Sequence, residues 1–173
     1  MNIETERLMI RSIERGDEKV FCQMAKDGSL TEVGFDKDCG EWIGDWIDEA
    51  LKLTADDDPR ADYIPCTILD KISNRIIGNV GCTYYEDTDL VGICYFIGEQ
   101  YRKNGYASEA VRAYIRYFFD HYDEKEIIAT IKDQNISSYK TAERSGFKLI
   151  ETKMYKDIYD EKEELYRFYA IER

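Results

Sequence analysis

The stretch RKNGYASEAVRAYIRYFF, Arg102–Phe119, decides how the rest of the chain is interpreted. It follows a strand-like run, turns at Gly105 and continues as a helix pattern. Apolar residues recur at helical spacing and form one continuous stripe: Ala107, Ala110, Val111, Tyr114, Ile115 and Phe118. The stretch therefore predicts a strand, a tight turn and an amphipathic helix in succession.

The start of this helix has the ingredients of an anion site. The first backbone N–H groups of a helix lack partners inside it, and the helix dipole adds partial positive charge there. Gly105 and Ala107 would let a phosphate approach the main chain, while Arg102 and Lys103 add positive charge. The sequence matches neither GxxxxGKS/T nor GxGxxG, which disfavours a nucleoside-triphosphate loop and a dinucleotide fingerprint. From these residues alone, a phosphate cradle and an ordinary structural turn both stay open.

The length of 173 residues suits one compact domain, and we expect residues 1–173 to form it. Hydrophobic residues make up 43% of the chain, enough for a core and too many for a disordered segment. The N-terminus lacks the apolar stretch of a signal peptide, and no apolar run approaches the length of a membrane span. These features predict a cytoplasmic protein with no membrane partner.

Cysteine and histidine usage argues against a metal site. The single histidine is His121, and five cysteines are scattered without a CxxC pair: Cys22, Cys39, Cys66, Cys82 and Cys94. We expect no metal, and we expect the cysteines to be small buried hydrophobes in a reducing environment, not disulfide partners.

Acidic residues outnumber basic ones, 36 to 24, for a formal net charge of −12. Such a chain repels the phosphate backbone of nucleic acid, so we expect no nucleic-acid partner. The charge either only keeps the protein soluble or also attracts cationic small molecules and basic polypeptides.

Periodicity predicts alternating strands and helices. The expected elements, in chain order, are a strand at 7–12, helices at 17–26 and 40–53, strands at 63–70, 75–85 and 91–99, a helix from 106, a strand at 126–132, a helix at 135–146 and two tyrosine-rich closing strands. Asn135 can cap its helix, and Gly146 can end it in the left-handed conformation. This order predicts an α/β fold built on a mixed sheet.

A second motif follows the strand at 126–132. Asn135, Ser138, Glu143 and Gly146-Phe147 form N-x-x-S-x(4)-E-x-x-G-F. Together with R-x-x-G-x-A from Arg102, it resembles the GNAT family of N-acetyltransferases, in the branch similar to ribosomal-protein N-terminal acetyltransferases (RimJ/RimL-like). TERLMIRS near the N-terminus and IIGNVG in the third strand resemble that branch too, so the likeness spans nearly the whole chain in order.

The resemblance implies a mostly antiparallel central sheet with flanking helices, whose fourth and fifth strands, here 91–99 and 126–132, splay apart to admit acetyl-CoA. The backbone at 102–107 would hold the CoA pyrophosphate, and the pantetheine arm would pair with the end of the fourth strand. The cofactor-binding residues implied are Phe96, Ile97, Arg102, Lys103, Asn104, Gly105, Tyr106, Ala107, Ser108 and Asn135.

The implied reaction is direct acetyl transfer from acetyl-CoA to a primary amine. The amine must lose a proton, and the departing thiolate must gain one or accept a hydrogen bond. Many family members use a Tyr as the acid where this chain has Ala142, so Ser138 is our candidate; a Ser that bonds its own helix turn is the alternative. Glu99 is the candidate participant in proton removal, with a solvated loop carboxylate as the alternative; Tyr95 and Glu86 are weaker candidates.

The acceptor would be a protein N-terminus, a polyamine or another small amine, and the negative charge favours a cationic one. The missing tyrosine also keeps open a non-catalytic acyl-CoA-binding sensor or partner module. Use of longer acyl chains stays open as well, although Tyr95 and Phe96 favour a short acyl group. Exposed strands near the C-terminus could support a homodimer.

Overall fold

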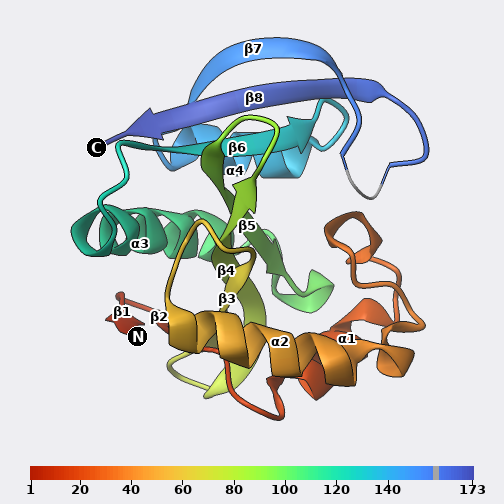
Figure 1. Ribbon diagram of the computed structural model, residues 1–173. Helices are drawn as coiled ribbons and strands as arrows, with labels where there is room; N and C mark the ends of the chain where they lie inside the picture. Colours follow the sequence, from red (N-terminus) through yellow and green to blue (C-terminus); the bar gives the residue numbers. More distant parts are fainter. Residues whose placement is uncertain (158–159) are drawn as a thin grey trace.

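The computed structural model describes residues 1–157 and 160–173. Over these residues the strands form one eight-stranded sheet in the order β1-β2-β3-β4-β5-β6-β8-β7 (Figure 1). The strands are β1 (Asn2–Glu4), β2 (Leu8–Ser12), β3 (Ile64–Asp70), β4 (Arg75–Tyr85), β5 (Leu90–Ile97), β6 (Glu126–Lys132), β7 (Lys148–Tyr155) and β8 (Glu164–Glu172). Neighbours are antiparallel except for β5 and β6, so the expected mixed, mostly antiparallel sheet is confirmed.

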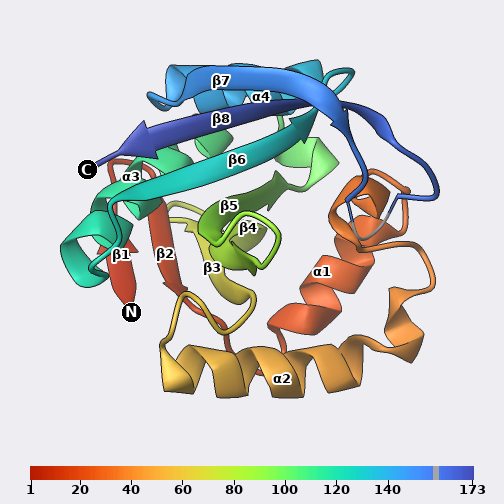
Figure 2. The same cartoon turned by 45° about the horizontal axis from the view of Figure 1, so that its top comes forward.

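Four α-helices flank the described part of this sheet: α1 (Asp17–Ala25), α2 (Ile43–Asp56), α3 (Tyr106–His121) and α4 (Ile136–Arg144). Short 3₁₀ turns lie at η1 (Thr31–Val33), η2 (Cys39–Glu41) and η3 (Glu99–Tyr101). Figure 2 shows α1 and α2 on one side of β2–β5, with α3 on the other. None of the helices within the described ranges is both long and apolar enough to span a bilayer.

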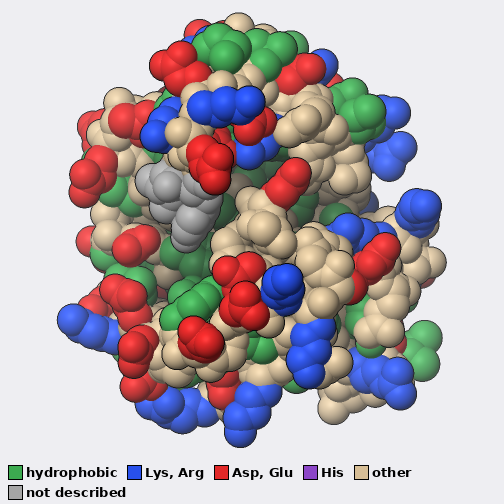
Figure 3. All heavy atoms as spheres, turned by 90° about the vertical axis from the view of Figure 1, so that its right-hand side faces the viewer, with side chains coloured by type: hydrophobic (Ala, Val, Ile, Leu, Met, Phe, Trp, Pro, Cys, Tyr) green, Lys and Arg blue, Asp and Glu red, His purple; other side chains and the backbone are tan. Residues whose placement is uncertain are grey.

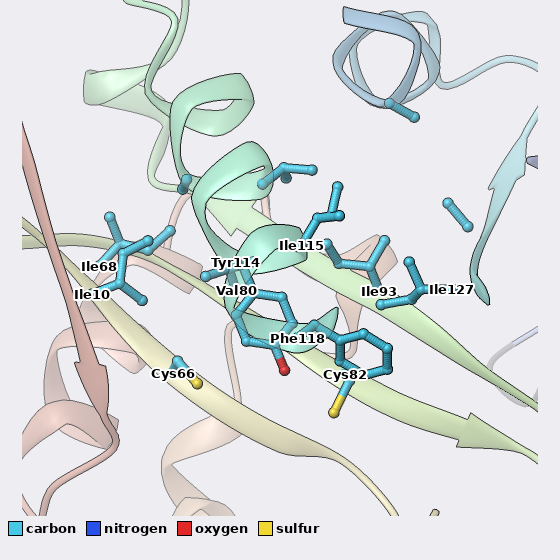
Figure 4. Packing of buried hydrophobic residues seen from close by; sticks show 14 of the residues in the cluster. Ile10, Cys66, Ile68, Val80, Cys82, Ile93, Tyr114, Ile115, Phe118 and Ile127 are labelled. Atoms are coloured by element: carbon cyan, nitrogen blue, oxygen red, sulfur yellow. The ribbon is translucent and has the colours of Figure 1, made fainter. Parts of the chain in front are cut away.

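Two apolar clusters join the helices to opposite faces of the sheet. Strand β5 serves both, because successive side chains of a strand point to opposite faces. Ile93 and Ile97 pack in the cluster under α3, whereas Phe96 packs in the cluster under α1 and α2. Figure 4 shows Tyr114 and Phe118 of α3 within the first cluster. Each such large buried side chain contributes roughly 1.5–3 kcal/mol.

The parallel contact between β5 and β6 is brief. Gly92 pairs with Ile128, and no further register pair joins the two strands among the described residues. Beyond this point β5 stays paired with β4 as far as Ile97, while β6 pairs with β8 along its whole length. The strands therefore separate after Gly92, as the predicted splay requires.

The structure corrects two expectations and adds one element. Cys22 and Cys39 are joined as a disulfide with Cα atoms 5.9 Å apart, so the expectation that no cysteine pairs is wrong for these two. Helix α2 begins at Ile43, not Gly40, because residues 39–41 form the separate turn η2. Strand β1 was not expected; its three residues are too few for an alternating pattern to show.

Candidate active site

A cleft of about 740 Å³ opens where β5 and β6 separate. One wall comes from Cys94 to Phe96 on β5, and the facing wall from Ala129 to Lys132 on β6. The rest of the lining comes from α2, from η1 and Phe35, from residues 61–63, from the ends of β4 and β7, from the start of α4 and from Tyr166 of β8. In Figure 3 hydrophobic groups are visible in the hollow between charged surface groups. An elongated ligand lying between the two strands would therefore meet apolar walls and unpaired strand edge.

The turn before α3 has the geometry of an anion cradle. Gly105 is the helix N-cap, with φ +79° in the left-handed region, and Lys103 also has positive φ at +65°. Within the described residues, the backbone N–H groups of 103–108 donate to no protein acceptor. Unpaired N–H groups at a helix N-terminus bind phosphate readily. The turn thus offers the free donors that the sequence predicted.

The side chains of this turn brace the loop itself. The Asn104 amide donates to the carbonyls of Tyr101 and Arg102, at 3.1 and 3.2 Å. The Arg102 guanidinium donates to the carbonyls of Ile97 and Ser29, both at 2.9 Å. Arg102 therefore joins the end of β5 to the segment after α1, a structural use that the sequence did not reveal.

The other cofactor-binding candidates fall into two groups. Phe96 and Ile97 are 7% and 6% exposed, and their side chains pack in the two apolar clusters on opposite faces of the sheet. Phe96 lines the cleft, whereas Ile97 does not. Asn135 caps α4: its Oδ1 accepts from the Ser138 N–H at 3.2 Å, as the sequence predicted. Its amide donates to Glu32 at 3.1 Å, which joins α4 to η1 at the edge of the cleft.

The two catalytic candidates lie in different places. Ser138 lines the cleft, and its carbonyl accepts a 2.8 Å hydrogen bond from the Tyr95 hydroxyl. Tyr95 thereby links β5 to α4 across the gap between the strands. Glu99 is exposed on η3 and is not part of the cleft lining. Ser138 thus lies at the cleft, and Glu99 lies outside its lining.

Sequence reasoning missed a hydroxyl pair at the narrow end of the splay. The Thr130 hydroxyl donates to the Tyr85 hydroxyl at 2.9 Å, and both residues line the cleft. Burial raises the pKa of Tyr85 well above 10, so its hydroxyl stays protonated at neutral pH. The Tyr85 ring lies across Gly92, where a Cβ atom would come within 2.3 Å of the ring. In the sequence, Gly92 in β5 is the one feature that could have indicated a side chain packed against this strand.

The cleft lining is predominantly acidic. Its acidic end is defined here by Glu86 and Asp87, in the turn between β4 and β5 at the opposite end of β5 from the cradle, whereas Glu32 lies on η1, on the cradle side. Within the described residues, six carboxylates and two lysines line the cleft: Glu32, Glu49, Asp62, Glu86, Asp87 and Asp157, with Lys132 and Lys156. Lys132 is already paired with Asp160 at 2.6 Å. Asp and Glu side chains crowd the surface on the left of Figure 3, whereas Lys and Arg are more frequent on the right. A positive group would be favoured at the acidic end.

Comparison with known proteins agrees with this geometry. A family model described as Acetyltransferase (GNAT) domain matches residues 7–148. The uncharacterized N-acetyltransferase YnaD of Bacillus subtilis (strain 168) is 26% identical over 148 residues, which cover 86% of this chain and 83% of YnaD.

Solved structures share the fold over almost the full length. A GNAT-family acetyltransferase from Bacillus anthracis superposes with a TM-score of 0.82 at 21% identity, covering 99% of this chain and 98% of that one. RimL, a ribosomal L7/L12 alpha-N-protein acetyltransferase in complex with coenzyme A, gives a TM-score of 0.80 at 15% identity, with 99% and 98% coverage. The chain therefore belongs to the GNAT family and is an N-acetyltransferase that uses acetyl-CoA.

Proposed function

We propose that this enzyme holds acetyl-CoA between β5 and β6 and transfers the acetyl group to a primary amine that enters from the acidic end of the cleft. The proposal rests on two features that follow each other along the chain: an apolar cleft between separating strands, lined by β5 as far as Phe96, and free N–H groups at residues 103–108. RimL, whose fold this chain shares, was solved in complex with coenzyme A, which supports coenzyme A as the ligand.

The cofactor would lie with its pyrophosphate at the turn before α3. The N–H groups there supply hydrogen bonds, and the helix dipole favours the negative charge. The pantetheine arm would run along the edge of β5 that β6 leaves unpaired after Gly92, with backbone pairing of the kind that an added strand makes. Asn135, at the start of α4, would border the arm.

The chemistry requires two proton transfers. The attacking amine must be neutral, and the resulting tetrahedral intermediate must lose a proton to a base or to water. A carboxylate of the cleft lining, such as Glu86, would receive that proton directly or through water. Ser138 would donate to the departing CoA sulfur.

The acceptor is proposed to be cationic beyond its reacting amine. Six carboxylates against two lysines give the cleft lining an excess of negative charge, and Glu49 and Glu86 form no ion pair within the part of the chain described. A second positive group would be attracted there. Polyamines and basic protein N-termini have this chemistry. RimL, a ribosomal L7/L12 alpha-N-protein acetyltransferase that shares this fold, supports a protein N-terminus as one acceptor class.

The test is CoA thiol release from acetyl-CoA with a panel of acceptors: spermidine, an N-terminal peptide with basic residues, its acidic counterpart and a neutral alkylamine. Turnover should be greatest for the cationic acceptors. Gly105→Glu should abolish CoA binding, because it puts bulk and negative charge at the cradle. Gly16→Glu is the matched control, since Gly16 is also a left-handed helix N-cap but belongs to α1. Equal CoA affinity in both variants would contradict the cofactor placement.

The second candidate is an acyl-CoA-binding module without turnover. Ala142 favours this second function, because many family members have at this position a tyrosine that acts as the general acid. Tight CoA binding with no thiol release in the presence of any acceptor, peptide or lysate would support this function over the first.

A further inference from the structure

Arg7, on the turn between β1 and β2, reaches the start of α3. Its guanidinium donates to the Asn104 carbonyl at 2.9 Å and to Glu109 at 2.7 Å. It also lies over the ring of Tyr106, 4.7 Å from the ring centre. One side chain from the N-terminal segment thus contacts three residues of the cradle and of the first helical turn.

Glu109 is held firmly as the partner in this contact. Besides the Arg7 side chain, it accepts from the Thr5 hydroxyl at 2.6 Å and from the Arg7 backbone N–H at 3.0 Å. Burial opposes its ionisation, but the hydrogen bonds from Thr5 and Arg7 outweigh burial and keep the pKa of Glu109 below its usual range. A carboxylate in the first turn of a helix is also favoured by the helix dipole. Thr5, Arg7 and Glu109, named here the N-terminal clamp, therefore form a fixed support.

The clamp sets the direction of one cradle donor. In a trans peptide the C=O and N–H groups point to opposite sides of the peptide plane. Because Arg7 holds the Asn104 carbonyl, the Gly105 N–H of the same peptide points away from Arg7, and it donates to no protein acceptor within the described residues. We propose that Arg7 is a positioning residue for the CoA pyrophosphate: it keeps the peptide 104–105 turned so that this N–H faces the phosphate.

Arg7 would act through orientation, not through added charge. Its guanidinium is paired with Glu109 at 2.6 Å, so the charges of the two groups largely compensate. A forked guanidinium can bind a carboxylate and a carbonyl at once, whereas a lysine ammonium lacks this fixed fork. Lysine should therefore fail to replace Arg7.

The test compares coenzyme A with pantetheine, which lacks the diphosphate, by titration calorimetry on the full chain. This inference rests on the proposed function, and the wild type checks it first: if coenzyme A binds no more tightly than pantetheine, the cofactor placement itself fails. Arg7→Met and Arg7→Lys should each weaken coenzyme A binding by about tenfold and leave pantetheine binding unchanged, the size expected for a lost hydrogen bond to a charged group.

Arg116→Met is the matched control, because it removes a positive charge from α3 two turns beyond Glu109. It should leave both affinities unchanged. Thr5→Val, a milder change that removes one donor to Glu109, should give a smaller loss confined to coenzyme A, and it replaces Arg7→Met if that variant does not fold. Equal weakening of both ligands would show a merely structural role, and unchanged coenzyme A affinity in Arg7→Lys and Thr5→Val would overturn the proposal.

Discussion

Ser138 is the residue on which the proposed chemistry is most directly testable. Ser138 lines the cleft, and its neighbour Ser137 lies on the same helical turn but is exposed and outside the lining. If Ser138 donates to the departing sulfur, Ser138→Ala should lower kcat by about 100-fold, the lower range of general acid catalysis. The affinity for coenzyme A, measured by calorimetry, should not change.

Ser137→Ala is the internal control for that experiment. The Ser137 hydroxyl donates to Asn135 Oδ1, and Ser137 is not part of the cleft lining. The Ser137→Ala variant should keep full activity. Loss of activity in both variants would indicate damage to the start of α4, and full activity in Ser138→Ala would assign the proton to water or to another group, such as Tyr85.

Among individual residues, the sequence predicted those whose role depends on backbone shape. Gly105 and Asn135 take the cap positions that their residue types favour. Roles that depend on distant partners could not be predicted. The sequence did not indicate that Arg102 would bond the carbonyl of Ser29, or that Tyr85 would bond Thr130, because pairs separated by tens of residues leave no local pattern.

At the scale of elements, a buried ion pair joins α1 to the sheet. Asp17, in the first turn of α1, accepts from Arg11 at 2.7 and 2.8 Å and from Thr67 at 2.6 Å. The Asp17 side chain is 5% exposed and that of Arg11 is 20% exposed, so loss of the Asp17 charge leaves the mostly buried Arg11 cation without its partner. Asp17→Asn should reduce the free energy of unfolding by about 3 kcal/mol in denaturant titrations. Asp48→Asn, which breaks the exposed pair with Arg15, should change it by less than about 0.5 kcal/mol.

The same pair gives a pH dependence with a defined sign. Burial opposes ionisation of Asp17, but its hydrogen bonds with Arg11 and Thr67 prevail and lower the pKa in the folded state. Its stabilisation is therefore present above the unfolded-state pKa of about 3.9 and is lost as pH falls through the lower, folded value. The difference in Tm between wild type and Asp17→Asn should shrink on acidification below about pH 4. A difference that stays constant down to pH 2 would contradict this.

Most elements were predictable because their hydrophobic period is long enough to recognise. The stripe on α3 is buried from Ala110 to Phe118, as its spacing indicates. What escaped was set by tertiary contacts over short segments: β1, the 3₁₀ turns and the Cys22–Cys39 link. The splay between β5 and β6 was predicted only from the family resemblance, because no local sequence pattern indicates that the two strands separate after one register pair.

For the whole molecule, the charge distribution makes a prediction about salt. If the acidic end of the cleft attracts a cationic acceptor, the KM for that acceptor should rise with ionic strength, while the KM for a neutral amine should not. Glu49→Gln combined with Asp62→Asn should raise the KM for the cationic acceptor several-fold at low salt and reduce the salt effect. Glu161→Gln combined with Glu163→Gln, both outside the cleft lining, is the charge-matched control. If the KM for the cationic acceptor depends on salt in the same way in the double variant and the wild type, these carboxylates do not contribute to acceptor binding.

The sheet also ends in an exposed strand. β7 is the last strand in the sheet order, and every residue but Tyr155 is exposed, with Ile150 at 66% and Met154 at 57%. An antiparallel pairing of β7 with β7 of a second copy, centred on Thr152, sets Glu151 opposite Lys153 and Ile150 opposite Met154. Opposite charges and apolar pairs across strands stabilise such a contact, and an unpaired strand edge offers its hydrogen bonds. We therefore expect a homodimer with a two-fold axis at Thr152.

Light scattering after size-exclusion chromatography would measure this dimer directly. Glu151→Lys places like charges opposite each other across the axis and should shift the protein toward monomer. Adding Lys153→Glu restores opposite charges in the exchanged order and should restore the dimer, while thermal unfolding checks that each variant folds. The double exchange also re-forms the ion pair between residues 151 and 153 within one chain. If it restores the Tm but not the dimeric mass, the effect of Glu151→Lys comes from this pair within one chain and not from a dimer. A wild-type protein that is monomeric at tens of micromolar would contradict this prediction, because a stable β7–β7 interface should give a dimeric mass at that concentration.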